Sequence, residues 1–127
     1  ELSGGMRQRV MIALALCAKP ALLIADEPTS ALDATLSREL MQLMVSLAEE
    51  FDTAMLVVSH DIALCSEFTH RTVVMKSGRV VEELPSATIA EAAQDPYTQG
   101  LLACIPTLDS ALLERLPTMN TYVGVRT

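Results

Sequence analysis

The stretch Leu22-Leu23-Ile24-Ala25-Asp26-Glu27-Pro28 decides the fold. Its first four residues form a short apolar run, which is typical of a strand buried on both faces of a parallel sheet. Two carboxylates, Asp26 and Glu27, follow at the end of that run. Ligands of open α/β sheets bind beyond the carboxyl ends of the strands, so these acids stand where a bound ligand would meet them. An isolated Asp-Glu pair is more often a solvated turn, so the neighbouring segments decide between the two interpretations.

A glycine turn lies upstream of this strand, in Glu1-Leu2-Ser3-Gly4-Gly5-Met6. The residues that follow, 6–16, predict a helix whose first N–H groups are free and whose positive dipole end faces outward. Such an end binds phosphate, and Gly4 and Gly5 allow the phosphate to approach the backbone closely. The hydroxyl of Ser3 can donate one further hydrogen bond. The alternative is that Ser3 only caps a buried helix.

A second apolar run, residues 54–58, lies downstream and is followed by Ser59-His60-Asp61. The carboxyl ends of parallel strands share one edge of a sheet, so we expect His60 beside Asp26 and Glu27. A histidine without such neighbours is more often structural. The second histidine, His70, matches no motif and is expected on the surface.

The segments between these motifs alternate in type. Residues 34–51 carry an apolar stripe at helical spacing, which predicts a helix packed on the sheet. The stripe consists of Leu36, Leu40, Leu43, Met44, Leu47 and Phe51. The order strand, helix, strand, helix favours an α/β fold with a mainly parallel sheet and flanking helices. Residues 72–75 and 79–82, joined through Ser77-Gly78, predict a closing antiparallel hairpin.

Taken in this order, the motifs resemble those of the ATP-binding cassette (ABC) ATPases, which have a P-loop NTPase fold. Residues 2–5 resemble the family signature, residues 22–27 the Walker B strand, and residues 30–33 the D-loop. His60 resembles the switch histidine. Several motifs in the right order, within about sixty residues, are far more specific than any one of them alone.

The resemblance implies a role for each motif residue. Asp26 would help to hold Mg²⁺ through water, which suits a metal bound by one or two carboxylates. Glu27 would be the catalytic base and His60 would sense the γ-phosphate of ATP, in a reaction that depends on positioning and charge stabilisation. Asp33 would couple the two sites of a dimer. The ATP bound to the opposite subunit would be completed by Ser3, Gly4 and Gly5.

The Gly-rich loop of P-loop enzymes, G-x-x-x-x-G-K-[ST], does not occur in the 127 residues. The chain has two lysines, Lys19 and Lys76, and neither stands in a glycine loop. The chain also begins at Glu1 without an initiator methionine. We therefore expect it to be the C-terminal part of a longer ATPase that lacks the Walker A loop, and we expect the isolated chain not to hydrolyse ATP.

Composition excludes several other classes of protein. A net charge of −7 with two Phe, two Tyr and no Trp argues against a nucleic-acid surface. The longest apolar stretch, residues 10–18, is far shorter than the roughly 20 residues that cross a bilayer. Cys17, Cys65 and Cys104 are widely spaced, so neither a disulfide framework nor a zinc site is indicated. The single cysteine near the C-terminus cannot supply the about four thiolates of an iron–sulfur cluster.

The composition changes after Pro85, which suggests residues 1–84 as the ATPase part and 85–127 as an extension. Ser86 is expected to begin a short alanine-rich helix that runs to Gln94, and Asp95-Pro96 another helix. Residues 95–106 resemble the C-terminal extension of peptide, nickel and related importer ATPases. Met6, where most ABC proteins have glutamine, also resembles the peptide-importer group.

These resemblances imply the ATPase subunit of an oligopeptide or dipeptide importer, bound peripherally at the cytoplasmic side of the inner membrane. Its expected partners are a second ATP-binding subunit, two membrane permease subunits and, indirectly, a substrate-binding protein. Nickel and glutathione remain alternative substrates. A non-transport ABC ATPase and an inactive interaction module remain alternative functions, and a Walker A loop upstream of Glu1 would exclude the module.

Overall fold

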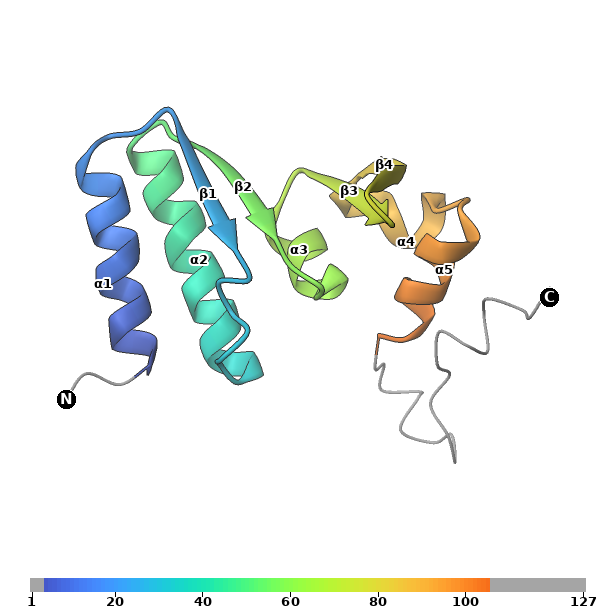
Figure 1. Cartoon of the computed structure of the whole chain (residues 1–127), viewed down its shortest axis with the longest axis horizontal. Coiled ribbons are helices and arrows are strands. Elements are labelled where there is room, and N and C mark those ends of the chain that lie inside the picture. The colour runs from blue at the N-terminus through green and yellow to red at the C-terminus, as the bar shows by residue number, and fades with distance from the viewer. Residues whose placement is uncertain (1–3, 106–127) are drawn as a thin grey trace. The chain divides into compact units, whose positions relative to one another are not determined.

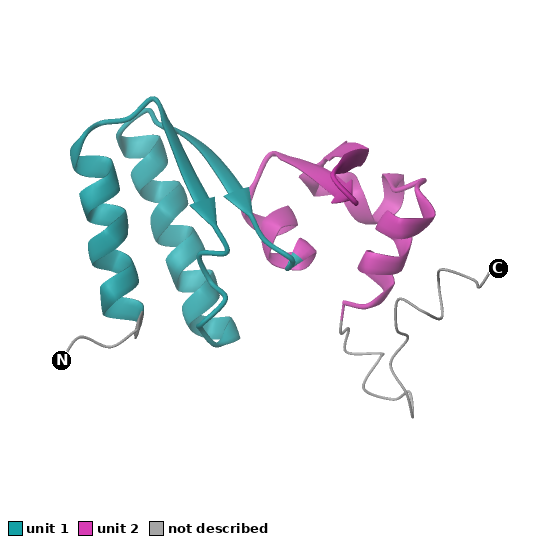
Figure 2. Cartoon of the chain, viewed as in Figure 1, with its two compact units in different colours: residues 1–61 teal, residues 62–127 magenta. Residues whose placement is uncertain are grey.

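The computed structural model describes residues 4–105, and Figure 1 shows their helices and strands. The chain divides into two compact units, residues 1–61 and residues 62–127 (Figure 2). Each unit contains its own pair of strands. Among the described residues, no helix is both long enough and apolar enough to cross a membrane.

The first unit consists of α1 (Gly4–Cys17), β1 (Leu22–Asp26), α2 (Ala34–Glu50) and β2 (Ala54–Val58). Figure 1 shows α1 and α2 side by side, with β1 and β2 running back in the opposite direction. The two strands pair in parallel and in register from their first residues to their last. The parallel pairing expected from the alternation of strands and helices is confirmed.

The core of this unit lies between the two helices and one face of the strands. Its most buried apolar side chains are Ile12, Leu16, Leu23, Leu40, Met41, Met44 and Ala48. The stripe expected on α2 is partly wrong, because Leu36 and Phe51 are 39% and 40% exposed. Ser37 and Met41 are buried instead. The buried face is therefore turned by about one position along the helix, which agrees with the i, i+3, i+4 spacing of a packed helix face.

The expectation that residues 22–25 are buried on both faces of the sheet is wrong for this structure. Leu23 is buried, but Leu22 and Ile24 are 48% and 61% exposed. Successive strand residues point to opposite faces, so these two lie on the same face. In β2, Leu56 and Val58 are likewise half exposed. One face of the strand pair packs in the core, and within the described residues of this unit nothing covers the other.

The second unit contains the antiparallel hairpin of β3 (Arg71–Lys76) and β4 (Arg79–Pro85). The two turn residues, Ser77 and Gly78, have φ of 50° and 75°. Positive φ at both positions is the geometry of the tight turns that match the twist of a hairpin. The hairpin expected from the sequence is confirmed, and β4 extends beyond the residues expected.

Short helices accompany this hairpin: α3 (Ile62–Phe68), the 3₁₀ turn η1 (Ser86–Thr88), α4 (Ile89–Ala92) and α5 (Pro96–Ala103). The single helix expected from Ser86 to Gln94 is wrong, because a 3₁₀ turn precedes a short α-helix that ends at Ala92. Ala93 is extended, with φ −60° and ψ 123°. The next two N–H groups donate to the carboxylate of Glu82 instead of continuing the helix.

Hydroxyl groups tie the end of β4 to its neighbours. Ser86 is 3% exposed, and its Oγ lies 2.9 Å from Thr69 Oγ1 and 2.7 Å from Thr72 Oγ1. Its N–H donates to the carbonyl of His70 at 3.0 Å. Because buried polar atoms cost free energy unless they are bonded, this cluster fixes where the hairpin ends and the following helices begin.

Candidate functional site

The carboxyl ends of β1 and β2 bring Asp26, Glu27 and His60 to one edge. Asp26 ends β1 opposite Val58, which ends β2. The N–H of Glu27 then donates to the carbonyl of Val58 at 2.8 Å, so the hydrogen bonding continues one residue past the strand. Glu27 has φ of 47°, a left-handed conformation that a residue with a side chain seldom adopts. Such backbone strain is typical of functional sites.

Glu27 and His60 are in direct contact. His60 Nδ1 lies 3.0 Å from both carboxylate oxygens of Glu27, and the backbone N–H of His60 donates to Oε1 at 3.1 Å. The His60 side chain is 80% exposed and that of Glu27 37%. The carboxylate is thus held at three points by one residue of the neighbouring strand end, while both side chains remain accessible to a ligand.

The Glu27 carboxylate changes the titration of the imidazole. Its hydrogen bond to His60, followed by its negative charge, raises the pKa of His60 above the ordinary value, and Asp61 adds a smaller effect in the same direction. A protonated imidazole donates from both ring nitrogens. Nδ1 can then serve the carboxylate while Nε2 donates to a second acceptor.

Asp26 lies next to this pair in the chain and is exposed. No cluster of three or more histidine, cysteine or acidic side chains that could hold a metal occurs between residues 4 and 105. The lone carboxylate nevertheless fits Mg²⁺, which is usually held by one or two carboxylates together with substrate phosphates and water.

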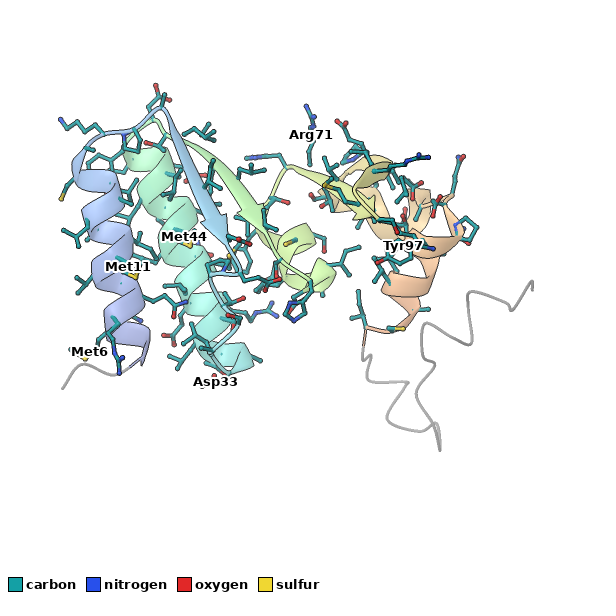
Figure 3. All side chains as sticks on the ribbon, viewed as in Figure 1. Met6, Met11, Asp33, Met44, Arg71 and Tyr97 are labelled. Carbon is teal, nitrogen blue, oxygen red and sulfur yellow. The ribbon has the colours of Figure 1, made fainter. Side chains whose placement is uncertain are left out.

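Asp33 lies at the start of α2 (Figure 3), and two turns lead to it from Glu27. The N–H of Ser30 donates to the carbonyl of Glu27 at 3.3 Å, and that of Leu32 to the carbonyl of Thr29 at 3.0 Å. The carboxylate of Asp33 accepts from the N–H of Leu36 at 3.0 Å. This is the bond of an N-cap, so Asp33 has a structural task whatever else it does.

The glycine turn is described only in part. Ser3 lies outside the described residues, whereas Gly4 and Gly5 are the first two residues of α1. A Cβ placed on Gly5 would meet no atom within 4 Å. The backbone at Gly5 is therefore accessible, as close approach of a phosphate to a helix start requires.

One contact at this edge was not expected from the sequence: Nε2 of Gln8, on α1, donates to the carbonyl of Pro28. The two residues are 20 positions apart, and both are partly buried. No pattern of residue types could have revealed the bond, because its acceptor is a backbone carbonyl that every residue carries.

Residues 1–30 match a family model described as ABC transporter. A putative peptide import ATP-binding protein of Brucella abortus is 48% identical over 119 residues, which are 94% of this chain and 36% of the relative. A glutathione import ATP-binding protein of Pectobacterium atrosepticum is 52% identical over 110 residues, which are 87% of this chain and 18% of the relative.

A solved structure resembles the chain as well. It is a dimeric ATP-binding cassette in a post-hydrolysis state, bound to ADP and Pi, with a TM-score of 0.58 and 42% identity. The match covers 67% of this chain and 36% of that one. The chain thus spans about a third of that cassette's length and of the Brucella relative's, 36% of each.

Proposed function

We propose that this chain, which belongs to the family of ABC transporter ATP-binding domains, is part of the ATP-hydrolysing subunit of a peptide importer. The contact between Glu27 and His60 at the carboxyl end of the strands carries the proposal. We also propose that residues 1–84 belong to the ATPase part and residues 85–127 to an extension.

In this proposal Glu27 is the catalytic base. Its carboxylate orients and deprotonates the water that attacks the γ-phosphate, a reaction governed by positioning and charge. His60 holds that carboxylate through Nδ1. With its pKa raised, the imidazole can donate from Nε2 to a γ-phosphate oxygen at the same time. Asp26 would hold Mg²⁺ through water, and the ion would supply positive charge that neutralises the phosphates.

The opposite end of the site belongs to a second subunit. Ser3, Gly4 and Gly5 bind the ATP of that subunit, and Asp33 couples the two sites. Because such a nucleotide contacts both subunits only when they are closed, it favours the closed state by differential affinity. A dimeric cassette with 42% identity over its matched region supports this arrangement.

The transport partners belong to the same proposal. The subunit would act at the cytoplasmic face of the inner membrane with a second ATP-binding subunit and two permease subunits, and indirectly with a substrate-binding protein. The Brucella relative's name supports peptides as the substrate. Glutathione, itself a peptide, is the alternative supported by the Pectobacterium relative. Uptake of labelled dipeptide, oligopeptide, glutathione and Ni²⁺ by cells with and without the gene would separate these substrates.

The assignment of Glu27 as the catalytic base is tested by Glu27→Gln in the complete protein. We expect ATP to bind as before and kcat to fall by about 10²- to 10⁴-fold, the usual worth of a general base. Glu50→Gln is the matched control, since it makes the same chemical change at an exposed position of α2. Near-normal hydrolysis by Glu27→Gln would refute the assignment.

The signature turn is tested in the same background. Glu27→Gln should accumulate an ATP-bound dimer on size exclusion, and adding Ser3→Arg should abolish that dimer by placing a large side chain against the nucleotide. A dimer that persists with Ser3→Arg would contradict the shared site.

A further inference from the structure

Gln8 links α1 to the turn that follows Glu27. Its side-chain Nε2 donates to the carbonyl of Pro28 from a partly buried position. The ion pair of Arg9 with Glu39, at 3.4 Å, also links α1 to α2. Both of its side chains are more than half exposed, and exposed ion pairs contribute little. The bond from Gln8 is therefore the more specific tether.

The carbonyl of Pro28 belongs to the turn that follows Glu27. The N–H of Ser30 donates to the carbonyl of Glu27, so residues 27–30 form a β-turn with Pro28 as its second residue. A type II turn would need a positive φ at its third residue, Thr29, but Thr29 is β-branched and is not among the residues with positive φ, so the turn is of type I. The bond from Gln8 ties this turn to α1.

Glu27 is the first residue of this turn and would be displaced if the turn moved. Its φ of 47° is left-handed, and a side-chain-bearing residue keeps that conformation only when its surroundings hold it. On one side, its own N–H donates to the carbonyl of Val58 at 2.8 Å. On the other side, Gln8 binds the carbonyl of the next residue. Between these two anchors, the carboxylate of Glu27 reaches His60.

We propose that Gln8 is a positioning residue, which holds the Pro28 carbonyl and thereby keeps the Glu27 carboxylate directed at His60. The inference rests on the proposed function, because it acts through Glu27 as the base. Gln8 also lies near the start of α1, which begins at Gly4. The helix end offered to the opposite subunit's ATP and the base of the subunit's own site are thus joined through one hydrogen bond.

The test uses the complete protein with three substitutions at this position. Gln8→Met keeps the length of the side chain and removes the donor, and Gln8→Glu replaces the donor by an acceptor. Gln8→Lys keeps a donor on a flexible side chain that is one bond longer. Gln42→Met is the matched control, because Gln42 is exposed on α2 and its side chain makes no hydrogen bond within residues 4–105. Circular dichroism establishes that each variant folds.

We expect Gln8→Met to lower kcat by about 10- to 100-fold, since a base displaced by about 1 Å loses that much. KM should change by less than about twofold, because binding of ATP does not depend on the bond. Gln8→Lys should recover most of kcat. An NMR titration should show the pKa of His60 moving toward its ordinary value in Gln8→Met, a change that a merely structural glutamine would not produce.

Unchanged kcat and an unchanged His60 pKa in Gln8→Met would overturn the positioning role. This result is distinct from failure of the base itself, which would appear as full turnover in Glu27→Gln. If Gln8→Met does not fold, Gln8→Glu and Gln8→Lys decide the question. Equal kcat in these two would overturn the proposal, and a kcat recovered only in Gln8→Lys would support it.

Discussion

Glu27 changes the titration of His60. The imidazole contacts both oxygens of the carboxylate, and this contact raises the pKa of His60. In Glu27→Gln the hydrogen-bonding shape is kept and the charge is lost. We expect the pKa of His60 to fall toward its ordinary value of about 6.5, measured by NMR titration of the imidazole in the isolated chain. Glu50→Gln should leave the titration of His60 as it is, and an unchanged titration in Glu27→Gln would contradict the contact.

The direction of the pKa shift of His60 determines how the stability of the fold depends on pH. The folded-state pKa of His60 lies above its unfolded value. The contact with Glu27 therefore stabilises the fold fully below the unfolded value, and that contribution is lost as the pH rises through the folded value. Because the imidazole is largely exposed, solvent screens much of the effect.

Some features of Glu27 could be predicted from the sequence, and others could not. The contact of His60 with Glu27 follows from two apolar runs ending in polar residues, because parallel strands bring their carboxyl ends to one edge. The left-handed backbone of Glu27 and the bond from Gln8 do not follow. Both depend on where a backbone N–H or carbonyl points, and residue type does not encode that direction.

The motif that ends α2 contains a residue with a strained backbone, and a substitution could relieve that strain. The N–H of Thr53 donates to the carbonyl of Ala48 at 2.8 Å, and that of Asp52 to Glu49 at 3.3 Å. This is the pair of bonds that closes a helix around a left-handed residue, usually glycine. Here the left-handed residue is Asp52, with φ of 51°.

Asp52→Gly should therefore stabilise the chain. Glycine adopts positive φ without a steric cost, and the gain should be about 0.5 kcal/mol after its larger unfolded-state entropy is included. Urea unfolding followed by circular dichroism measures the difference. Asp52→Ala is the counterpart, because alanine has a Cβ but no side-chain oxygen to ease the conformation. A loss of stability in Asp52→Gly would show that the aspartate carboxylate contributes more to stability than its left-handed backbone conformation costs.

In the second unit, Glu82 of β4 holds the start of α5. Its carboxylate accepts the N–H of Gln94 at 2.7 Å and that of Asp95 at 3.3 Å. The N–H of Gln94 is the largest cause that lowers the pKa of Glu82. Lys76 adds a second tether, because its Nζ lies 4.7 Å from the centre of the Tyr97 ring. The start of α5 and the loop before it are thus bonded to the hairpin at two places.

Glu82→Gln should loosen this attachment. The folded-state pKa of Glu82 lies below its unfolded value, so its contribution is present above the unfolded value and disappears as the pH falls through the folded value. We expect lower protection of the amides of Gln94 and Asp95, measured as hydrogen exchange relative to its intrinsic rate at the same pH, in Glu82→Gln at neutral pH and in the unmodified chain on acidification. Glu83→Gln is the control on the same strand. Equal exchange in both variants would contradict the role of Glu82.

Helices could be predicted from the sequence where their apolar spacing extended over many residues. The prediction was wrong where contacts between residues distant in sequence determine the structure. The seventeen residues of α2 were found from their apolar spacing, although the buried face is turned toward Met41. The helix expected from Ser86 was cut short because Glu82 takes the N–H groups after Ala93. A bond between β4 and the loop after α4 cannot be read from the local sequence, since the carboxylate and the N–H groups are twelve or more residues apart.

At the scale of the whole chain, the apolar residues that point away from the core are the main departure from the sequence-based expectation. In the first unit these are the exposed residues of β1 and β2, Leu22, Ile24, Leu56 and Val58. Their positions alternate with those of the core, as a two-sided apolar strand requires. The residue types thus indicate burial on both faces, whereas the described residues of this unit cover one.

This exposed face should govern how the 127-residue chain behaves by itself. Contiguous exposed apolar surface promotes association, and we expect the chain to form concentration-dependent oligomers in sedimentation velocity. The double variant Ile24→Thr, Leu56→Thr should shift the population toward monomer, because threonine keeps the strand propensity while making the face polar. Val80→Thr is the control, since Val80 is 58% exposed on β4 of the second unit. If Val80→Thr reduces association as much as the double variant does, the face of β1 and β2 is not the cause. A chain that stays monomeric at all concentrations would show that this apolar face does not drive association.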